Sequence, residues 1–319
     1  MLLILTDEFD SHVNYILQKL GENNLSYFRL DTNVQALKYT YVTYMNSKWF
    51  IKNKNGNVDS TSITCVWSRR PFVELMLEEY NDQSTDFRIW KNEWNKTLLG
   101  LYNSLKNVKW LNPLRKAYKG ENKYYQFELA EEVGLLMPDT IVSNEKQELM
   151  NFAIENEPVV LKLMSQEIYQ VNNEVMGFYV NKIMARDLES YNVVDENPIV
   201  LQRYIPKAYE VRYTVVGNKH FACRINSQQS DSAKEDWRRY DIPNTPHLVI
   251  TPPDEIRNKV NELLSLLHIE YGALDFVVTP DNEWVFLEIN CMGQWLWIEN
   301  LTGLNISDAI IEWISDNIN

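Results

Sequence analysis

The stretch that decides the fold reads ALDFVVT at residues 273–279, PDNE at 280–283 and WVFLEIN at 284–290. Both apolar runs have the composition of strands, and Pro-Asp-Asn between them is typical of a turn. With a four-residue loop, Thr279 pairs with Trp284, and Asp275 then lies directly opposite Glu288. Side chains alternate along a strand, so Asn290 shares the face of Glu288.

The polar face of this predicted hairpin has the composition of a metal site. Directly opposed Cβ atoms lie about 4.5–5.5 Å apart, so the carboxylates of Asp275 and Glu288 repel unless a cation lies between them. Hard oxygen ligands favour magnesium, with manganese as the alternative, over zinc. A solvated edge hairpin with chance acids is the other interpretation. The opposite face weighs against it, because all its members are apolar: Leu274, Phe276, Val278, Val285, Leu287 and Ile289.

The composition excludes several classes of protein. The 319 residues, 45% hydrophobic and 24% charged, suit a globular chain of two or three lobes. A formal net charge of −13 argues against nucleic acid as a partner. Cys65, Cys223 and Cys291 have no short spacing, which indicates neither a zinc site nor a disulfide framework. The apolar run at 2–5 is too short for a signal peptide or a membrane span, so we expect a cytoplasmic protein without membrane contact.

The order of predicted elements divides the chain into three lobes. An N-terminal α/β lobe is expected over residues 1–117, with a strand at 2–5, a helix ended by Gly21 and a strand at 27–30. It lacks the glycine fingerprint of dinucleotide-binding lobes. A small α+β lobe is expected over 118–200, with a strand at 159–164 and a hairpin formed by 169–171 and 177–180. The third lobe, 201–319, holds the acidic hairpin.

Two lysines and one strand end are candidates for nucleotide binding. Lys162 lies in an apolar strand, where an ammonium group needs an anionic partner or must extend to water. A phosphate contact and a solvated edge lysine are equally good interpretations of it. Lys123 lies near the start of a predicted helix, and this position alone predicts a solvated side chain. The backbone at Gln202-Arg203-Tyr204-Ile205 could read an adenine edge, although an ordinary strand end explains the same residues.

One predicted hairpin places two further arginines. With Gly217-Asn218 as its turn, Val211 pairs with Arg224. Arg212 and Arg224 then fall on opposite faces unless a bulge intervenes.

Two arginine pairs are candidates for binding carboxylates or phosphates through bidentate hydrogen bonds. Arg69-Arg70 follow a strand end, and Arg238-Arg239 lie in a charged, aromatic loop. Solvated loops are the alternative for both pairs. The four histidines are scattered and form no nucleophile–base pattern.

Taken in chain order, these residues resemble the ATP-grasp superfamily over nearly the whole chain. The acid pair followed by Glu-x-Asn is the most specific element of the resemblance. The resemblance implies an α/β chain with the ATP-grasp fold, in which an N-terminal α/β lobe precedes two lobes that clasp ATP. It also implies roles for individual residues: phosphate contacts for Lys123 and Lys162, adenine contacts for Gln202, Arg203, Tyr204 and Ile205, a ribose contact for Glu210, and magnesium ligation for Asp275, Glu288 and Asn290.

Within this superfamily the chain is similar to the microviridin-type graspetide synthetases, which form macrocycles in ribosomally made peptides. This likeness rests on WSRRP at 67–71, on YIPK at 204–207 running into EVRY at 210–213, and on DWRRY at 236–240. One superfamily feature is missing. Residues 164–167 read MSQE where many ATP-grasp ligases have a glycine-rich phosphate loop.

The likeness implies an ADP-forming carboxylate ligase that uses ATP and magnesium. The γ-phosphoryl group passes to an Asp or Glu side chain of a precursor peptide, and a Thr or Ser hydroxyl or a Lys amine then closes an ω-ester or ω-amide ring. Arg212 and Arg224 are implied to stabilise the acyl phosphate. Arg69, Arg70, Arg238 and Arg239 are implied to bind substrate carboxylates.

The expected partner is a precursor peptide with a leader and a core, and a homodimer is among the expected assemblies. We hypothesise that the hairpin around 169–180 offers an apolar surface on which a helical leader docks. Two alternatives stay open. One is an ATP-grasp ligase that adds an amino acid to a protein or small molecule, and the other is a non-catalytic ATP-binding regulatory module.

Overall fold

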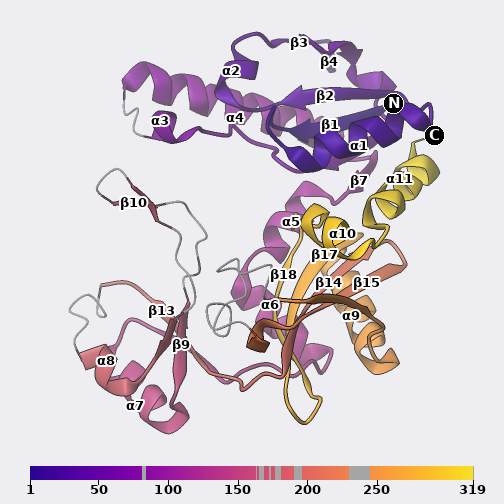
Figure 1. Ribbon diagram of the computed structural model, residues 1–319. Coiled ribbons are helices and arrows are strands. Elements are labelled where there is room, and N and C mark those ends of the chain that lie inside the picture. The colour runs from indigo at the N-terminus through magenta and orange to yellow at the C-terminus, as the bar shows by residue number, and fades with distance from the viewer. Residues whose placement is uncertain are drawn as a thin grey trace.

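The computed structural model describes residues 1–80, 84–162, 164, 169–171, 174–176, 181–189, 196–229 and 245–318. Figure 1 shows a mixed α/β chain in which the N-terminal lobe lies above a central lobe and a C-terminal lobe. Both chain ends lie on the same side of the N-terminal lobe (Figure 1). Among the described residues, no helix is long and apolar enough to cross a membrane.

The N-terminal lobe is built on a parallel sheet with the strand order β2-β1-β6-β7. Its strands are β1 (Leu2–Thr6), β2 (Tyr27–Asp31), β6 (Cys65–Ser68) and β7 (Lys109–Leu111). The fully buried run of β1 is expected for a strand in the middle of such a sheet. The lobe also contains α1 (Ser11–Glu22), α2 (Val34–Leu37), α3 (Leu77–Tyr80), α4 (Thr85–Ser104) and η1 (Ser60–Ser62).

A small antiparallel sheet, β3-β4-β5, lies at the outer side of this lobe (Figure 1). Its strands are β3 (Tyr41–Met45), β4 (Lys48–Asn53) and β5 (Gly56–Asp59). Asn46 and Ser47 both have positive φ, as a two-residue hairpin turn requires. The predicted end of the first helix at Gly21 is wrong: α1 continues to Glu22, and Asn24 with φ 54° follows it.

The central lobe is an antiparallel sheet covered on one face by two helices. The strand order is β12-β9-β13-β8, with β8 (Thr140–Ser143), β9 (Val159–Lys162), β12 (Asn181–Ile183) and β13 (Ile199–Arg203). Helices α7 (Lys146–Asn156) and α8 (Ala185–Glu189) bury Leu161 and Leu201 on one face. The expected lobe boundary at residue 200 falls inside β13.

A separate hairpin extends from this lobe toward the N-terminal lobe (Figure 1). Strand β10 (Tyr169–Val171) pairs antiparallel with β11 (Glu174–Met176). The sequence predicted 177–180 as the partner strand, which is wrong because 174–176 takes that place. Residues 177–180 lie outside the described part of the chain.

The C-terminal lobe is a five-stranded antiparallel sheet with the order β16-β15-β14-β17-β18. Helices α5 (Leu114–Gly120), α6 (Lys123–Glu132) and α9 (Asp254–Leu267) cover one face. Helices α10 (Leu296–Thr302) and α11 (Ile306–Asn317) pack with α1 and β1 against part of the other face. The remaining elements are β14 (Tyr209–Val216), β15 (Lys219–Ile225), η2 (Ser227–Gln229), β16 (His247–Ile250), β17 (Tyr271–Val278) and β18 (Trp284–Asn290).

The acidic hairpin has the predicted pair but a different turn. Val278, not Thr279, pairs with Trp284, so the loop is one residue longer than expected. A register shift next to Asp275 then restores the predicted pairing of Asp275 with Glu288. The shift also changes which side chains of β18 face the core. Trp284 and Phe286 join the core cluster, so the prediction of Val285 and Leu287 for that face is wrong.

Candidate functional site

Asp275 lies on the polar face of the C-terminal sheet, beside Arg212. The two residues are cross-strand partners on β17 and β14. Arg212 Nη1 donates to both carboxylate oxygens of Asp275, at 2.9 and 2.8 Å. Burial disfavours the arginine's charge, but Asp275, together with Tyr271 and Glu288, raises the pKa of Arg212 above its usual value. The sheet therefore supplies a permanent cation beside this acid.

Glu288, the cross-strand partner of Asp275, has its own cation. Lys123 Nζ, at the first position of α6, lies 2.8 Å from Glu288 Oε2. The two atoms are within ion-pair distance but not aligned for a hydrogen bond, and the buried Nζ has no other hydrogen-bond partner among the described residues. A third acid, Glu121, lies nearby. Burial raises the pKa of Glu121, while Lys123 partly opposes that shift.

Gln126 fixes the strand that carries the acid. Its Nε2 donates to the Ile289 carbonyl at 2.8 Å and to the Gly120 carbonyl at 2.6 Å. Its Oε1 accepts the Ile289 N–H at 3.1 Å. Because β18 is an edge strand, this wholly buried side chain takes the place of a neighbouring strand at the residue between Glu288 and Asn290.

The donor set on this face fits a divalent ion that prefers oxygen. Asp275 and Glu288 are directly paired, and Asn290 lies two residues further along β18, opposite Ala273. Among the described residues no three His, Cys, Asp or Glu side chains are placed to hold one metal ion together, so the third ligand here would be the Asn290 amide. Two carboxylates and an amide suit magnesium, which keeps water or phosphate in its remaining positions.

The central sheet presents Lys162 and Gln202 on one face. Gln202 pairs with Val160, and Lys162 pairs with Val200. Even-numbered residues of both strands therefore point away from the face that α7 and α8 cover. Gln202 Nε2 donates to Thr140 Oγ1 at 3.0 Å, while its buried Oε1 has no hydrogen-bond partner among the described residues.

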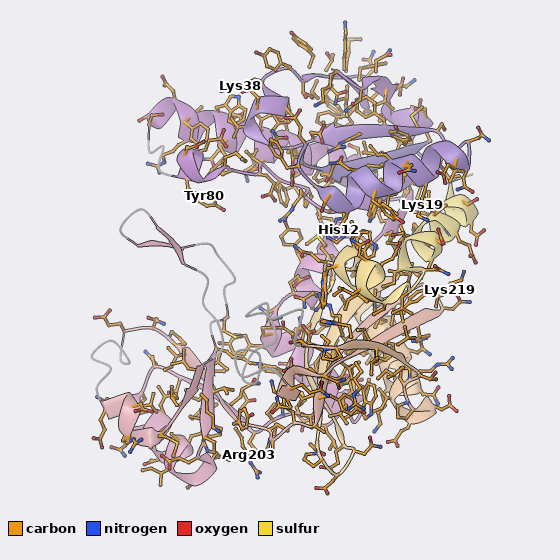
Figure 2. All side chains as sticks on the ribbon, viewed as in Figure 1. His12, Lys19, Lys38, Tyr80, Arg203 and Lys219 are labelled. Atoms are coloured by element: carbon orange, nitrogen blue, oxygen red, sulfur yellow. The ribbon has the colours of Figure 1, made fainter. Side chains whose placement is uncertain are left out.

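The chain leaves this sheet at Arg203, Tyr204 and Ile205. The N–H groups of Arg203 and Tyr204 donate to the carbonyls of Asp139 and Pro158, each at 2.9 Å. In the described part of the chain, the N–H of Ile205 has no hydrogen-bond partner, so it can donate to a ligand. The Arg203 side chain is exposed beside Asp139, and Figure 2 shows it low on the central lobe, on the side of the C-terminal lobe.

Lys182 was not predicted from the sequence. Lys182 lies on β12 and pairs with Val160 of β9, so it shares the face of Lys162 and Gln202. Its Nζ lies 4.4 Å from the centre of the Tyr204 ring, a cation–π distance. The sequence around Lys182 does not indicate a binding role, because only the register of the sheet brings this lysine to the same face.

Glu210 lies on the same face of β14 as Arg212. It forms an ion pair with Lys207 and accepts a hydrogen bond from Ser227 Oγ at 3.0 Å. The predicted register of this hairpin is confirmed: Val211 pairs with Arg224 and Arg212 with Cys223.

Arg224 therefore points to the face opposite Arg212. Its guanidinium lies 3.9 Å from the centre of the Tyr209 ring, and its Nε donates to Asn226 Oδ1 at 2.6 Å. The structure thus separates Arg224 from the acidic cluster by the thickness of the sheet.

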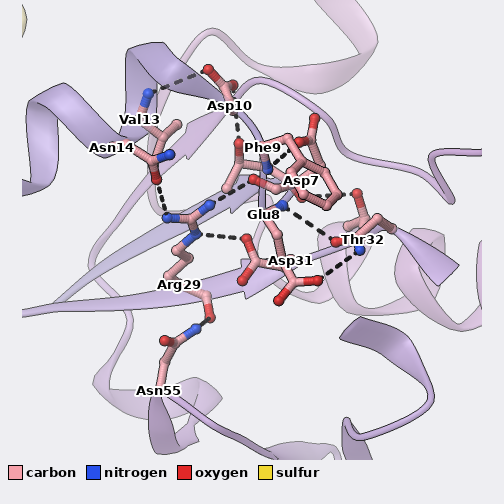
Figure 3. Close-up of polar contacts among 12 residues, drawn as sticks. Asp7, Glu8, Phe9, Asp10, Val13, Asn14, Arg29, Asp31, Thr32 and Asn55 are labelled. Atoms are coloured by element: carbon pink, nitrogen blue, oxygen red, sulfur yellow. Dashed lines mark hydrogen bonds and ion pairs between the residues drawn. The ribbon is translucent and has the colours of Figure 1, made fainter. Parts of the chain in front are cut away.

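Arg69 is buried at the junction of the N-terminal and C-terminal lobes. Its Nε donates to Asp10 Oδ2 at 3.0 Å, and its Nη1 donates to the carbonyls of Met292 and Gly293. Figure 3 shows the same Asp10 carboxylate at the start of α1, where it accepts the Val13 N–H. The Nε and Nη1 donors of Arg69 are thus engaged by the protein. Arg69 holds the loop that follows Asn290.

Arg70 is half-exposed, in contrast to its neighbour. Its Nε lies 3.6 Å from Asp7 Oδ2, and its Nη1 lies 3.6 Å from Glu74 Oε1. The other predicted pair, Arg238 and Arg239, lies outside the described residues. Of the four predicted substrate arginines, Arg70 alone has an exposed side chain in the part of the chain that the structure describes.

The loop 291–294 is held from several elements. Asn112 Nδ2 donates to the Cys291 carbonyl at 2.9 Å, and Glu121 Oε1 accepts the Cys291 N–H at 2.6 Å. Arg212 Nη2 donates to the Gln294 carbonyl at 3.3 Å. A Cβ at Gly293 would lie 2.6 Å from the Ala273 Cβ, so this close approach requires glycine. The contact of Asn112 joins the N-terminal lobe to the end of the strand that carries Glu288 and Asn290.

Comparison with known proteins identifies the class. Residues 1–118 match the family model of the MvdD pre-ATP grasp domain. A RiPP-associated ATP-grasp ligase from Chryseobacterium gregarium, solved with ADP and with leader and core peptide, is 26% identical at a TM-score of 0.86, covering 99% of this chain and 96% of that one. No curated protein sequence matches the chain.

Two macrocyclases from Microcystis aeruginosa MRC are similar over their whole lengths. MdnC, solved with its precursor peptide MdnA, is 28% identical at a TM-score of 0.85, covering 99% of both chains. MdnB is 29% identical at a TM-score of 0.81, covering 98% of both chains. The predicted ATP-grasp fold and the resemblance to microviridin-type ligases are confirmed. The chain is an ATP-grasp ligase, and it resembles the macrocyclising members of that group.

Proposed function

We propose that this chain is an ATP-dependent macrocyclase of a ribosomally made precursor peptide. One observation carries the proposal. Asp275 and Glu288 are directly paired beside Asn290 on one sheet face, in a chain that resembles macrocyclases over its whole length. Paired acids flanked by buried cations suit the transfer of a phosphoryl group, because such chemistry needs positioning and charge neutralisation more than covalent help from the protein.

The nucleotide is proposed to lie between the central and C-terminal sheets. Ile205 N–H and the backbone of Arg203 and Tyr204 would contact adenine, with Gln202 Oε1 available for the adenine amino group. Glu210 would hold ribose. Lys162 and Lys123 would contact phosphates, since both belong to the faces that border this position.

Asp275, Glu288 and Asn290 are the proposed ligands of Mg²⁺, with Mn²⁺ as a substitute. When bound there, the ion would neutralise charge on the transferring phosphoryl group. Arg212 would stabilise the acyl phosphate from the same face. Arg224 points away from this face and is left out of the proposed catalytic set.

The reaction proposed has two steps. A side-chain carboxylate of the peptide attacks the γ-phosphorus of ATP, which yields an acyl phosphate and ADP. A hydroxyl or amine of the same peptide then attacks the acyl carbon, the phosphate leaves, and the nucleophile loses its proton. Arg70 is the described candidate for binding peptide carboxylates, with Arg238 and Arg239, which lie outside the described residues, as further candidates. Arg69 positions the loop after Asn290.

The precursor is proposed to engage through a leader and a core. The hairpin β10–β11 stands away from the central sheet (Figure 1), and it is our proposed docking site for the leader. The relatives from Chryseobacterium gregarium and Microcystis aeruginosa were solved with such peptides, which supports this assignment. Binding of a leader-only peptide tests it. Undiminished binding by a chain in which 169–176 is replaced by a Gly-Ser linker would exclude the hairpin.

A homodimer is proposed on a specific surface of the N-terminal lobe. Strand β3 is an edge strand without charged residues. Tyr41, Tyr44 and Met45 on it are exposed, as is Phe50 on β4. Such an edge pairs readily with another strand unless charges protect it. Sedimentation of the chain and of a Thr43→Lys variant checks this, and an unchanged monomer in both would exclude it.

Mass spectrometry of the product tests the proposed function. The chain is incubated with ATP, Mg²⁺ and a short peptide encoded beside it that contains repeated Thr and Asp or Glu residues. Macrocyclisation removes one water per ring and releases one ADP for each. A product heavier by an amino-acid residue would instead indicate the amino-acid ligase. Absence of peptide-dependent ADP release would indicate the regulatory module. The cytoplasm is the proposed compartment, because ATP and newly made peptides are both present there.

A further inference from the structure

We propose that Lys123 and Arg212 make the metal site conditional on nucleotide, because they neutralise its carboxylates until phosphate groups draw Lys123 away. This inference rests on the proposed function. It predicts that the site rejects a divalent ion that arrives alone and accepts one that arrives with a nucleoside di- or triphosphate.

Each acidic ligand already has a cation at close range. Arg212 Nη1 binds both oxygens of Asp275, at 2.9 and 2.8 Å, and Lys123 Nζ lies 2.8 Å from Glu288 Oε2. All four side chains are largely shielded from water, with exposed fractions of 8% and 16% in the first pair and 11% and 18% in the second. Ion pairs in such surroundings are screened far less than pairs on the surface. A metal ion must therefore compete with cations that water does not weaken.

The two protein cations weaken the attraction of this region for a lone ion. Among the described residues, three carboxylates (Glu121, Asp275 and Glu288) lie here with Lys123 and Arg212, so two of the three negative charges are already balanced. A divalent ion would enter beside both cations and meet repulsion from each. The oxygens it needs are also engaged, since both oxygens of Asp275 accept hydrogen bonds from Arg212.

The two cations differ in how easily they can move. Arg212 is held at three points, by both Asp275 oxygens and by the Gln294 carbonyl. Lys123 holds Glu288 by charge alone, because its buried Nζ makes no aligned hydrogen bond. A lysine is a compact charge on a flexible stem, so a phosphate oxygen can attract it by a small rotation of the side chain. Lys123 is therefore the mobile cation, and Arg212 the fixed one.

Nucleotide makes this region much more negative. A polyphosphate brings several negative charges and offers Lys123 oxygens with which it can make full hydrogen bonds. Glu288 then loses its ion pair with Lys123, and its Oε2 oxygen can turn to the metal. Binding of metal and nucleotide are thus coupled through one side chain, and the coupling must be reciprocal. The strand itself need not move, because Gln126 fixes Ile289 independently of Lys123.

The test is a titration of the chain with Mn²⁺ in the absence of nucleotide. The electron paramagnetic resonance signal of free Mn²⁺ measures how much of the ion remains unbound. Wild type is compared with Lys123→Met, Lys123→Gln and Lys123→Arg. Lys259→Met serves as the matched control, because it removes the same charge from an ion pair with Glu255 on α9, away from the sheet's polar face. The same series is repeated with ADP present.

The expected result is that both neutral variants bind Mn²⁺ more tightly than wild type without nucleotide, by about tenfold or more, which is the effect of removing one nearby charge. Lys123→Arg and Lys259→Met are expected to behave like wild type. With ADP, the advantage of the neutral variants over wild type should shrink. Equal Mn²⁺ affinity in wild type and both neutral variants would overturn the proposal, as would equal tightening in Lys259→Met.

The outcome is separate from the fate of the proposed function. No peptide is present in the titration, so a chain that fails to cyclise peptides can still show the effect of Lys123. Conversely, a chain that cyclises its peptide but binds Mn²⁺ equally in all variants retains the function and refutes the conditional site.

Discussion

Gln126 gives the sharpest prediction for a residue that touches neither nucleotide nor metal. Gln126→Leu removes the partner of three buried backbone groups: the Ile289 N–H and the carbonyls of Ile289 and Gly120. An unsatisfied buried group costs about 1–3 kcal/mol, so the three together cost about 3 kcal/mol even at the low end. The segment between Glu288 and Asn290 also loses its lateral support, so the Mg²⁺ concentration needed for half-maximal ADP release should rise about tenfold.

Leu129→Ala is the matched control for this prediction. Leu129 lies on the same helix and is buried in the core cluster. A buried Leu→Ala change costs about 2–5 kcal/mol, which is comparable to the low-end cost at Gln126. Urea denaturation measures the free energy of unfolding of both variants, and peptide-dependent ADP release measures their Mg²⁺ requirement. We expect both to be destabilised and only Gln126→Leu to need more Mg²⁺.

Two results would refute this reasoning. If Leu129→Ala raises the Mg²⁺ requirement as much as Gln126→Leu, the effect comes from general destabilisation and not from the strand. If Gln126→Leu leaves the requirement unchanged while losing stability, the geometry of β18 does not limit metal binding.

Three further outcomes are expected. Burial lowers the pKa of His12 from 6.5 to about 4. Stability present above pH 6.5 is therefore lost as the pH falls towards 4, by about 3 kcal/mol at most, and denaturation across this range should show a weaker acid dependence in His12→Gln than in wild type. Gly293→Ala places a Cβ 2.6 Å from that of Ala273, and the shifted loop should lower ADP release about a hundredfold in a chain whose circular dichroism is unchanged. Arg212→Lys keeps the charge but loses the two-oxygen contact, and it should lower turnover about a hundredfold without changing substrate affinity in a binding titration.

The sequence predicted the pairing of the two acids for a reason that was partly wrong. A four-residue loop gave Asp275 opposite Glu288. The structure reaches the same pair through a loop one residue longer and a compensating register shift beside Asp275. A bulge is not readable from alternating apolar residues when the strand is apolar on both faces, as β18 is at Trp284, Val285 and Phe286. The composition therefore located the site, while only the structure gave its register.

Contacts that depend on tertiary packing were not predictable. The sequence shows Lys123 and Gln126 as ordinary helix residues, and only the packing of α6 on β18 brings them to Glu288 and Ile289. Helix α4 was missed although its sequence carries a helical signal. Phe87, Trp90 and Trp94 in its first half are spaced three and four residues apart, and their rings contact one another along the helix.

The arginines illustrate the same limit. Arg69 follows a strand end, which favoured a ligand site, yet its donors hold Asp10 and the 292–293 carbonyls. A sequence reveals that a guanidinium is present but not whether the protein already occupies it. The register of β14 and β15, in contrast, follows from a two-residue turn, and the opposite placement of Arg212 and Arg224 was correctly predicted.

Peptide-dependent ADP release by Glu288→Gln, compared with Glu283→Gln, tests the central claim most directly. Both changes remove one carboxylate from the same hairpin, but Glu283 is exposed in the turn, and Glu288 faces Asp275 and Lys123. We predict that Glu288→Gln abolishes ADP release in a folded chain and that Glu283→Gln retains it. Wild-type release by Glu288→Gln at limiting Mg²⁺ would contradict the assignment of this carboxylate pair to the metal that positions the nucleotide.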